Sequence, residues 1–210
     1  MQQPPASDVA FSPAVKAVQA RRGSREGYAQ LEQKGGFRTR ITPELAEFLA
    51  SARSFYFATA SAEGQPYMQH RGGPQGFLRM LDANTLGFAD YAGNRQYITT
   101  GNLSENPRAM LFVMDYRARR RVKLWGTARS IAEPAQAAPQ LWAELCPQGY
   151  AARLEQAILF DVVAWDMNCA QHIPRLLAAE DVAETIRQFQ ARIRELEAEV
   201  ERLKAAAPPP

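Results

Sequence analysis

The sequence contains little cysteine and histidine, with two of each among its 210 residues: Cys146, Cys169, His70 and His172. Two cysteines cannot form the framework of several disulfides that stabilises small secreted domains. The four residues also do not follow a spacing that is typical of zinc sites. We therefore expect no structural metal and no disulfide scaffold.

Long apolar runs are missing as well. The longest, residues 157–165 (AILFDVVAW), is interrupted by Asp161 and is much shorter than the roughly 18 residues that span a bilayer. The first residues, MQQPPASD, lack the basic start and the apolar stretch of a signal peptide. We expect a cytoplasmic protein that has no membrane partner.

The chain has no large excess of charge of one sign, because its net charge is only +3. Its basic residues are nonetheless clustered in one short segment that contains Arg117, Arg119, Arg120, Arg121 and Lys123. Such a cluster could contact the phosphates of a nucleic acid or of a small molecule. Zinc-finger spacing, an RNP-like motif and a clear helix-turn-helix are all missing. We therefore expect no nucleic-acid partner and keep polyanion binding as the less favoured alternative.

Three short helices are predicted before the main body of the chain. Residues 12–13 (Ser-Pro) and 42–43 (Thr-Pro) each combine a capping side chain with a proline at the first helical position. Ser24 could cap another helix between them. We expect a helical leader over residues 1–53, with the first ten residues disordered.

From Ser54 onward the pattern changes to short strands separated by turn signals. The expected strands are SFYFATAS, PYMQHRG, FLRML, TLGFAD, AMLFVMDY, RRVKLWGTARSI and QAILFDVVAWDM. Most links between them are too short for crossover helices, which argues against a parallel sheet. We expect a mainly β (α+β) fold with six to seven antiparallel strands in a closed or sandwiched sheet.

Polar side chains gather at the ends of two of these strands. Residues 69–71 (Gln-His-Arg) end one strand, Asp90 and Tyr91 end another, and residues 93–96 (GNRQ) then open a predicted helix. A helix start offers free N–H groups and the positive end of its dipole to a phosphate. Arg95 can add a bidentate charged contact. The alternative is a glycine turn followed by a capped surface helix.

The order of these pieces resembles the pyridoxamine 5'-phosphate oxidase-like FMN-binding split-barrel family. The resemblance covers roughly residues 54–172 and rests on FYFATASAEGQPYMQHRGG, then TLGFADYAGNRQYITTGNLSENPRAMLFVMD, then RRVKLWGTARSI. It implies a split β-barrel over residues 54–175 and a homodimer with flavin mononucleotide (FMN) in a cleft between the subunits. By position, the residues implied to contact FMN are Gln69, Arg71, Asp90, Tyr91, Asn94, Arg95, Gln96, Arg121, Trp165 and Asn168. Arg121 would reach the flavin of the other subunit.

Two features depart from the vitamin B6 oxidases of this family. Gln96 stands where the family has a lysine of the phosphate site, a loss that Arg71 or Arg121 could compensate. The carboxyl-terminal Arg-Leu-x-Pro ending that helps those enzymes hold their substrate is missing. The late stretch AWDMNCAQHIP instead looks like a signature of one bacterial subgroup. The flavin is therefore expected here, and the vitamin B6 substrate is not.

His70 and His172 are the candidates for proton donation beside the flavin, because imidazole titrates near neutral pH. For each, the alternative is a hydrogen-bonded structural histidine. Cys169 could be a redox thiol, although cysteine is more often a buried apolar residue. Cys146 is expected in the core.

The predicted function is that of an FMN-dependent oxidoreductase that acts on a small molecule or accepts electrons from a reduced nicotinamide. A GxGxxG fingerprint is missing, so a nicotinamide would dock only transiently. One alternative is a non-catalytic module that binds FMN or the deazaflavin F420. The other is the polyanion binder.

A heptad pattern follows the predicted barrel. Between Glu184 and Lys204 the apolar residues are spaced by 3, 4, 3, 4 and 3 positions: Ile186, Phe189, Ile193, Leu196, Val200 and Leu203. We expect a helix over residues 180–204 that forms a parallel two-stranded coiled coil, and then a disordered tail over residues 205–210. The alternative is a single amphipathic helix that docks on its own barrel.

Overall fold

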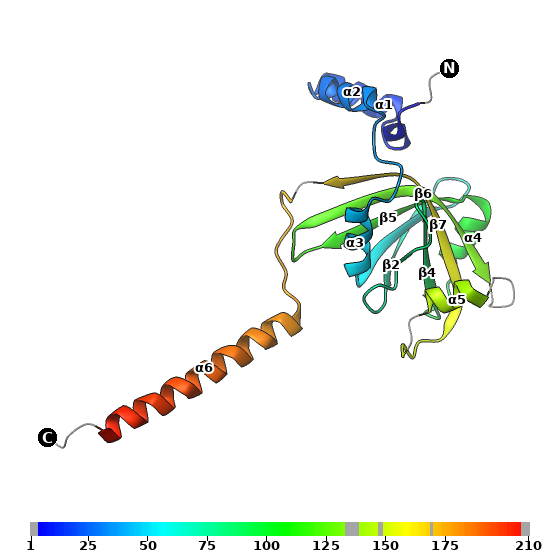
Figure 1. Ribbon diagram of the computed structural model, residues 1–210. Coiled ribbons are helices and arrows are strands. Elements are labelled where there is room, and N and C mark those ends of the chain that lie inside the picture. Colours follow the sequence, from blue (N-terminus) through cyan, green and yellow to red (C-terminus); the bar gives the residue numbers. More distant parts are fainter. Residues whose placement is uncertain (1–3, 133–138, 147–148, 169, 207–210) are drawn as a thin grey trace. The chain divides into compact units, whose positions relative to one another are not determined.

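The computed structural model describes residues 4–132, 139–146, 149–168 and 170–206. The chain divides into two compact units. The first, residues 1–115 and 120–170, contains the leader and the sheet, and the second, residues 116–119 and 171–210, contains one long helix (Figure 1). No described helix combines the length and the apolarity that crossing a bilayer requires.

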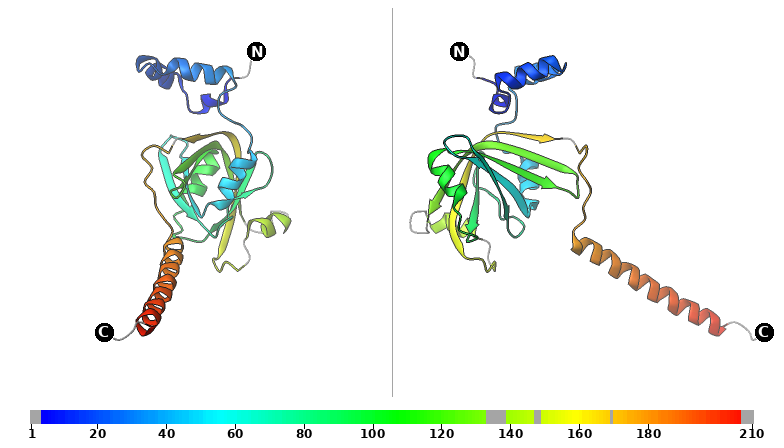
Figure 2. Two further views of the ribbon diagram at one scale, coloured as in Figure 1. Left: turned by 60° about the vertical axis from the view of Figure 1, so that its left-hand side comes forward. Right: turned by 180° about the vertical axis from the view of Figure 1, so that it is seen from behind.

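Seven strands form one antiparallel sheet in the first unit: β1 Ser54–Ala60, β2 Pro66–Gly72, β3 Arg79–Met80, β4 Thr85–Tyr91, β5 Arg108–Asp115, β6 Arg120–Ala132 and β7 Leu154–Asn168. Their order in the sheet is β2-β1-β5-β6-β7-β4-β3. The sheet curls round to form a split barrel (Figures 1 and 2). The predicted mainly β fold with six to seven antiparallel strands is confirmed.

The inner face of the sheet forms the core because side chains alternate between the two faces along each strand. Phe55, Phe57 and Phe88 are buried there, and the Phe88 ring packs edge-on against both of the others. Each such buried side chain contributes roughly 1.5–3 kcal/mol. Trp125 lies on the outer face, where the Phe37 ring stacks on it at 5.3 Å.

The outer face of β2, β1 and β5 carries a band of partly exposed apolar side chains. Tyr56 lies opposite Phe112, while Met68 and Met110 lie on the two sides of Ala58. Met68 is 62% exposed and Tyr56 is 37% exposed. We call Tyr56, Met68, Met110, Phe112 and Met114 the outer apolar face.

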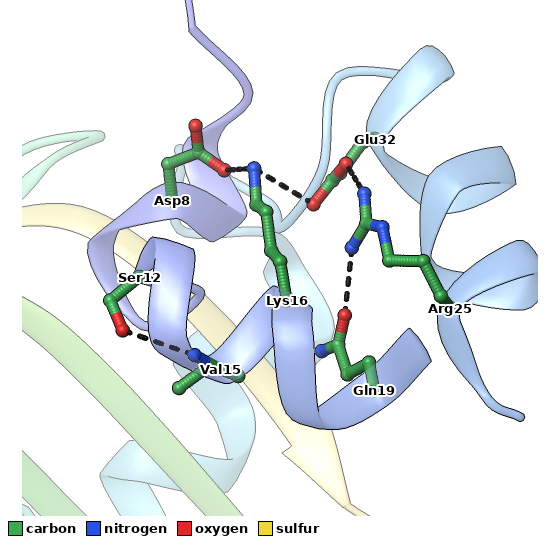
Figure 3. Close-up of polar contacts among 7 residues, drawn as sticks. All are labelled: Asp8, Ser12, Val15, Lys16, Gln19, Arg25 and Glu32. Atoms are coloured by element: carbon green, nitrogen blue, oxygen red, sulfur yellow. Dashed lines mark hydrogen bonds and ion pairs between the residues drawn. The ribbon is translucent and has the colours of Figure 1, made fainter. Parts of the chain in front are cut away.

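The leader contains η1 Ala6–Val9, α1 Pro13–Arg21, α2 Arg25–Gln33 and α3 Pro43–Ser51. Ser12 caps α1, since its hydroxyl accepts from the Val15 N–H at 3.3 Å (Figure 3). Thr42 caps α3 in the same way through the Leu45 N–H at 3.3 Å. Ser24 precedes α2 but its side chain makes no capping bond, so that part of the prediction is wrong.

Charged side chains join η1 to α1 and α2 (Figure 3). Lys16 lies 2.6 Å from Asp8 and 3.3 Å from Glu32, and Arg25 also pairs with Glu32. The hydrogen bond from Arg25 holds the pKa of Glu32 below its ordinary value. The expectation that the first ten residues are disordered is therefore wrong for Ala6–Val9, which forms a 3-10 helix within this network.

Two further helices lie against the sheet in the first unit. α4 Ile98–Glu105 follows β4, and α5 Pro139–Leu145 precedes β7. Cys146 directly follows α5 and packs, partly buried, against the apolar cluster that α5 forms with β7. Burial raises the pKa of its thiol, in keeping with the expected core position. Cys169 lies outside the described residues.

Candidate functional site

A polar cavity lies where the ends of β2, β4 and β7 meet the loop that precedes α4. It is lined by seven of the residues predicted to contact a cofactor: Gln69, Arg71, Asp90, Tyr91, Asn94, Arg95 and Gln96. Its volume is about 60 Å³, far below the roughly 300–1,000 Å³ of most small-molecule sites. Within one chain the cavity therefore has room for a small polar group and not for a ring system.

Side chains along β2 point alternately to the two faces of the sheet, and this decides which of them face the cavity. Arg71 and Gln69 lie opposite Phe55 and Phe57 of β1, whose side chains enter the core. Gln69 and Arg71 therefore point inward, and His70 between them points outward. Because β2 is an edge strand, its inward polar groups reach the split of the barrel.

Arg71 and Asp90 form an ion pair across that split. Their strands, β2 and β4, are not neighbours in the sheet, so this pair links the two sides through side chains. Only 14% of the Arg71 side chain and 8% of the Asp90 side chain are exposed. The Arg71 Nε atom is buried and has no hydrogen-bond partner in the described part of the chain. One donor of this guanidinium therefore remains for a ligand.

The Asp90 carboxyl is also bound from β7. The Gln156 Nε2 atom donates to Asp90 at 2.8 Å and lies 2.8 Å from the Thr100 hydroxyl. Burial raises the pKa of Asp90 above its ordinary value, an effect that Arg71 and the hydrogen bond from Gln156 partly oppose. An anion that enters the cavity must compete with Asp90 for Arg71.

The loop of residues 93–97 has a strained backbone. Arg95 has a φ of 59° and Tyr97 a φ of 52°, a left-handed conformation that costs a non-glycine residue roughly 1–3 kcal/mol and is concentrated at functional sites. The Gln96 N–H donates to the Asn94 side chain at 3.2 Å and closes a turn. The prediction that residues 93–96 open a helix is wrong, because these two conformations delay the start of α4 to Ile98.

Charges of both signs surround the loop. The Arg95 Nε donates to the Tyr97 hydroxyl at 3.2 Å, and that hydroxyl donates to Glu155 at 2.6 Å. The cavity lining thus holds two arginines and two carboxylates, with Arg71 and Asp90 buried and Arg95 exposed. An anionic ligand gains contacts with both cations, while the carboxylates limit its affinity.

The first turn of α4 completes the cavity. Ile98, Thr99 and Thr100 line it, and the Thr99 hydroxyl donates to Gln69 at 3.2 Å. The first N–H groups of a helix have no intrahelical acceptor. They favour an anion at this end of the helix.

Two further predicted residues lie on the outside of the sheet. His70 is exposed and its ring lies 5.9 Å from that of Tyr56. Arg121 is half-buried and lies opposite Met114 of β5. Both therefore border the outer apolar face and not the cavity of their own chain.

The remaining predicted residues lie elsewhere. Trp165 is buried, and its indole N–H donates to the Arg40 carbonyl at 2.7 Å. Asn168 is the last residue of β7, where its backbone lies opposite Arg121. His172 belongs to the second unit, is exposed and has a φ of 62°.

Several lining residues were not predicted: Tyr67, Tyr97, Thr99, Thr100, Glu155 and Gln156. A signal existed for Thr99 and Thr100, since they follow the GNRQ segment within one helical turn. No sequence pattern indicated Glu155 and Gln156. They lie at the cavity because β7 pairs with β4, which places Gln156 opposite Asp90.

Side chains of the basic segment are engaged locally. Arg120 lies 3.8 Å from Asp115 and 5.3 Å over the Phe48 ring. Lys123 lies 3.4 Å from Asp166. These contacts do not favour a surface for polyanions. Among the described residues, no three histidine, cysteine or acidic side chains are grouped as metal ligands.

Similar folds occur among solved structures. HupZ of Group A Streptococcus is 19% identical, with 65% of this chain and 99% of that chain covered and a TM-score of 0.47. An F420 reductase is 19% identical, with coverages of 60% and 98% and a TM-score of 0.40. An FMN-binding protein of Syntrophomonas wolfei is 14% identical, with coverages of 76% and 99% and a TM-score of 0.43. At these values the likeness carries no argument about cofactor or activity.

No curated protein matches the chain. The family model described as pyridoxamine 5'-phosphate oxidase, in contrast, matches residues 41–169. That match spans more than half of the chain and includes all seven strands and the lining of the cavity. The chain therefore belongs to the pyridoxamine 5'-phosphate oxidase-like family.

Proposed function

We propose that the chain is an FMN-dependent oxidoreductase whose cavity binds the phosphate of FMN. The observation that carries the proposal is the gathering of seven predicted contact residues around one cavity. They come from β2, from the end of β4 and from the loop before α4. Segments far apart in the sequence thus supply side chains to one cavity, which supports the proposal.

The residues present fit the phosphate end of this cofactor. Arg71 keeps a buried donor without a partner, Arg95 offers an exposed guanidinium, and the start of α4 adds backbone N–H groups. Gln96 contributes no charge, so these two arginines would hold the phosphate. When bound, the flavin would supply the hydride or electron chemistry, and the protein would bind and orient it.

The cavity of about 60 Å³ is by itself too small for the flavin ring. We propose that a second copy of the chain packs on the outer apolar face and supplies the other wall. Exposed apolar patches of this kind mark interaction surfaces. A further hollow of about 460 Å³, lined by Ala58, Met110, Trp125 and Val163 among others, lies on the same side of the sheet.

Arg121 and His70 gain a role in such a dimer. Both border the outer apolar face, so each would approach the partner's flavin and not its own. His70 would then be a candidate proton donor there, and His172 stays a second candidate. A small-molecule substrate or a reduced nicotinamide would dock on the exposed flavin, and the cytoplasmic location stays a prediction.

The test is a visible absorption spectrum of the purified protein, followed by mass spectrometry of whatever acid releases. We expect the absorption of an oxidised flavin and the mass of FMN. Release of F420 would correct the cofactor. A colourless protein that binds DNA in a salt-dependent way would favour the polyanion alternative. Failure of NADH, NADPH or other donors to reduce bound FMN in stopped-flow measurements would favour a non-catalytic flavin module.

Arg121→Gln is expected to lower the reduction potential of the bound flavin by on the order of 20–40 mV. A cation beside the ring favours its electron-rich state, so removing that charge disfavours reduction. A potentiometric titration measures the shift. Lys123→Gln is the matched control, because the Lys123 charge is already opposed by Asp166 at 3.4 Å. An equal shift in both variants would contradict a contact between Arg121 and the partner's flavin.

A further inference from the structure

The helix α6, Ala179–Ala206, exposes a continuous apolar stripe. The residues of the stripe are each 42–65% exposed: Val182, Ile186, Phe189, Ile193, Leu196, Val200 and Leu203. Their spacing alternates between four and three positions, which is the period of a coiled-coil seam. Because α6 begins at Ala179, the pattern also includes Val182, which adds one seam position at the start of the predicted heptads.

The stripe is narrow. The positions beside it carry mostly polar side chains: Thr185, Gln190, Arg192, Glu197, Glu199 and Lys204. A helix that docks on a sheet needs a wider apolar face, whereas a two-stranded coiled coil buries only this seam. We propose that α6 pairs with α6 of a second copy of this chain in a parallel two-stranded coiled coil.

The residues of the seam favour this form. Ile186, Ile193 and Val200 occupy the a positions, and the d positions hold Val182, Phe189, Leu196 and Leu203, with leucine at the last two. β-Branched residues at a with leucine at d favour two parallel strands over three or four. The stripe is therefore complementary to a second copy of itself.

The flanking charges agree with the parallel orientation. Arg192 at g would face Glu197 at e of the second copy, and Glu199 at g would face Lys204 at e. Each pair occurs twice in the symmetric dimer. In the single helix, Arg192 lies 2.9 Å from Glu195 and Lys204 lies 2.9 Å from Glu201. These contacts are on exposed side chains, so they can be exchanged for the contacts between helices at little cost.

Disulfide crosslinking of the full chain tests the pairing. The background variant carries Cys146→Ser and Cys169→Ser, and Leu203→Cys is then added at a d position. Mild oxidation should join most chains into dimers on a non-reducing gel. Ala198→Cys, at the f position on the opposite side of the helix, is the matched control and should crosslink little. Equal crosslinking of the two variants, or none at Leu203→Cys, would overturn the proposal.

Orientation is tested by a second pair of variants. In an antiparallel pair, position 186 of one helix lies near position 203 of the other. Chains with Ile186→Cys and chains with Leu203→Cys are coexpressed with tags of different mass. In the parallel coil, each variant should crosslink mainly to another copy of the same variant. Mixed dimers as the main product would overturn the parallel arrangement.

The coiled coil is independent of the proposed flavin site. Adding Ile193→Asp to the Leu203→Cys variant should lower the crosslinked fraction about tenfold, since a carboxylate in the seam is strongly disfavoured. Ala198→Asp adds the same charge outside the seam and should leave crosslinking unchanged. Bound flavin, read from the visible spectrum, should be retained in both. Unchanged crosslinking in Ile193→Asp would refute the coil, whereas a colourless protein that still crosslinks would refute only the flavin proposal.

Discussion

Replacing Arg71 by glutamine should lower the free energy of unfolding by about 3–5 kcal/mol near neutral pH, the range for removing one partner of a buried ion pair. Only 14% of the Arg71 side chain and 8% of the Asp90 side chain are exposed, so water cannot replace the guanidinium. The Asp90 carboxylate would keep the hydrogen bond from Gln156 but lose its counter-charge. Denaturant unfolding followed by circular dichroism measures the loss.

Two control variants separate the buried charge from other effects. Arg129 pairs with Asp161 at 2.5 Å, but these side chains are 56% and 43% exposed, so Arg129→Gln should cost at most about 1 kcal/mol. The double variant with Arg71→Gln and Asp90→Asn should recover most of the lost stability, because no unpaired charge remains. A double variant as unstable as Arg71→Gln alone would show that the charge of Asp90 is not the cause.

The loss of unfolding free energy in Arg71→Gln should also depend on pH. Burial already raises the pKa of Asp90 in the folded chain, and loss of Arg71 removes an effect that opposes this rise. A carboxyl whose pKa is raised in the folded chain destabilises the fold when it is ionised. Its contribution to stability is most favourable below the unfolded pKa of about 3.9, where the carboxyl is protonated in both states. This contribution is lost as the pH rises through the pKa of the folded chain. The deficit should therefore shrink as the pH is lowered from 7 toward 4. A constant deficit over this range would contradict the explanation.

The strands could be predicted from the sequence because alternation and turn signals are local properties. The same alternation could also have separated His70 from Arg71, since neighbours on a strand face opposite sides. The position of Trp125 was harder to predict, because its outer side is covered by Phe37 of the leader. The alternation of apolar and polar side chains shows which residues share a face of the sheet. It does not show whether another segment of the chain covers that face.

The cavity could be predicted only in part for a similar reason. Arg71, Asp90 and Arg95 were expected together because the order of the motifs resembles a known family. Gln156 reaches Asp90 through the register between β4 and β7, which no local pattern specifies. The late start of α4 depends on the left-handed backbone of Arg95 and Tyr97, which propensity does not predict for these residue types.

Riboflavin, which lacks the phosphate, should bind on the order of 100-fold or more weakly than FMN. A phosphate accepts several charge-assisted hydrogen bonds, each contributing roughly 1.5–3 kcal/mol, and each 1.4 kcal/mol corresponds to about tenfold in affinity. Titration of the apoprotein, followed by the quenching of flavin fluorescence, gives both dissociation constants. Equal affinities would remove the argument that the cavity is a phosphate site.

Arg95→Ala shows whether the phosphate is held at this loop. Its guanidinium is exposed at the cavity and donates to the Tyr97 hydroxyl at 3.2 Å, a weak contact that it can exchange for one with an anion. The variant should bind FMN about tenfold more weakly, whereas its affinity for riboflavin should not change. Arg129→Ala removes an exposed arginine that does not line the cavity and should leave both affinities unchanged. Equal weakening of FMN and riboflavin in Arg95→Ala would mean that the substitution disturbs the loop, and the phosphate would then have to be held by Arg71 and the first turn of α4.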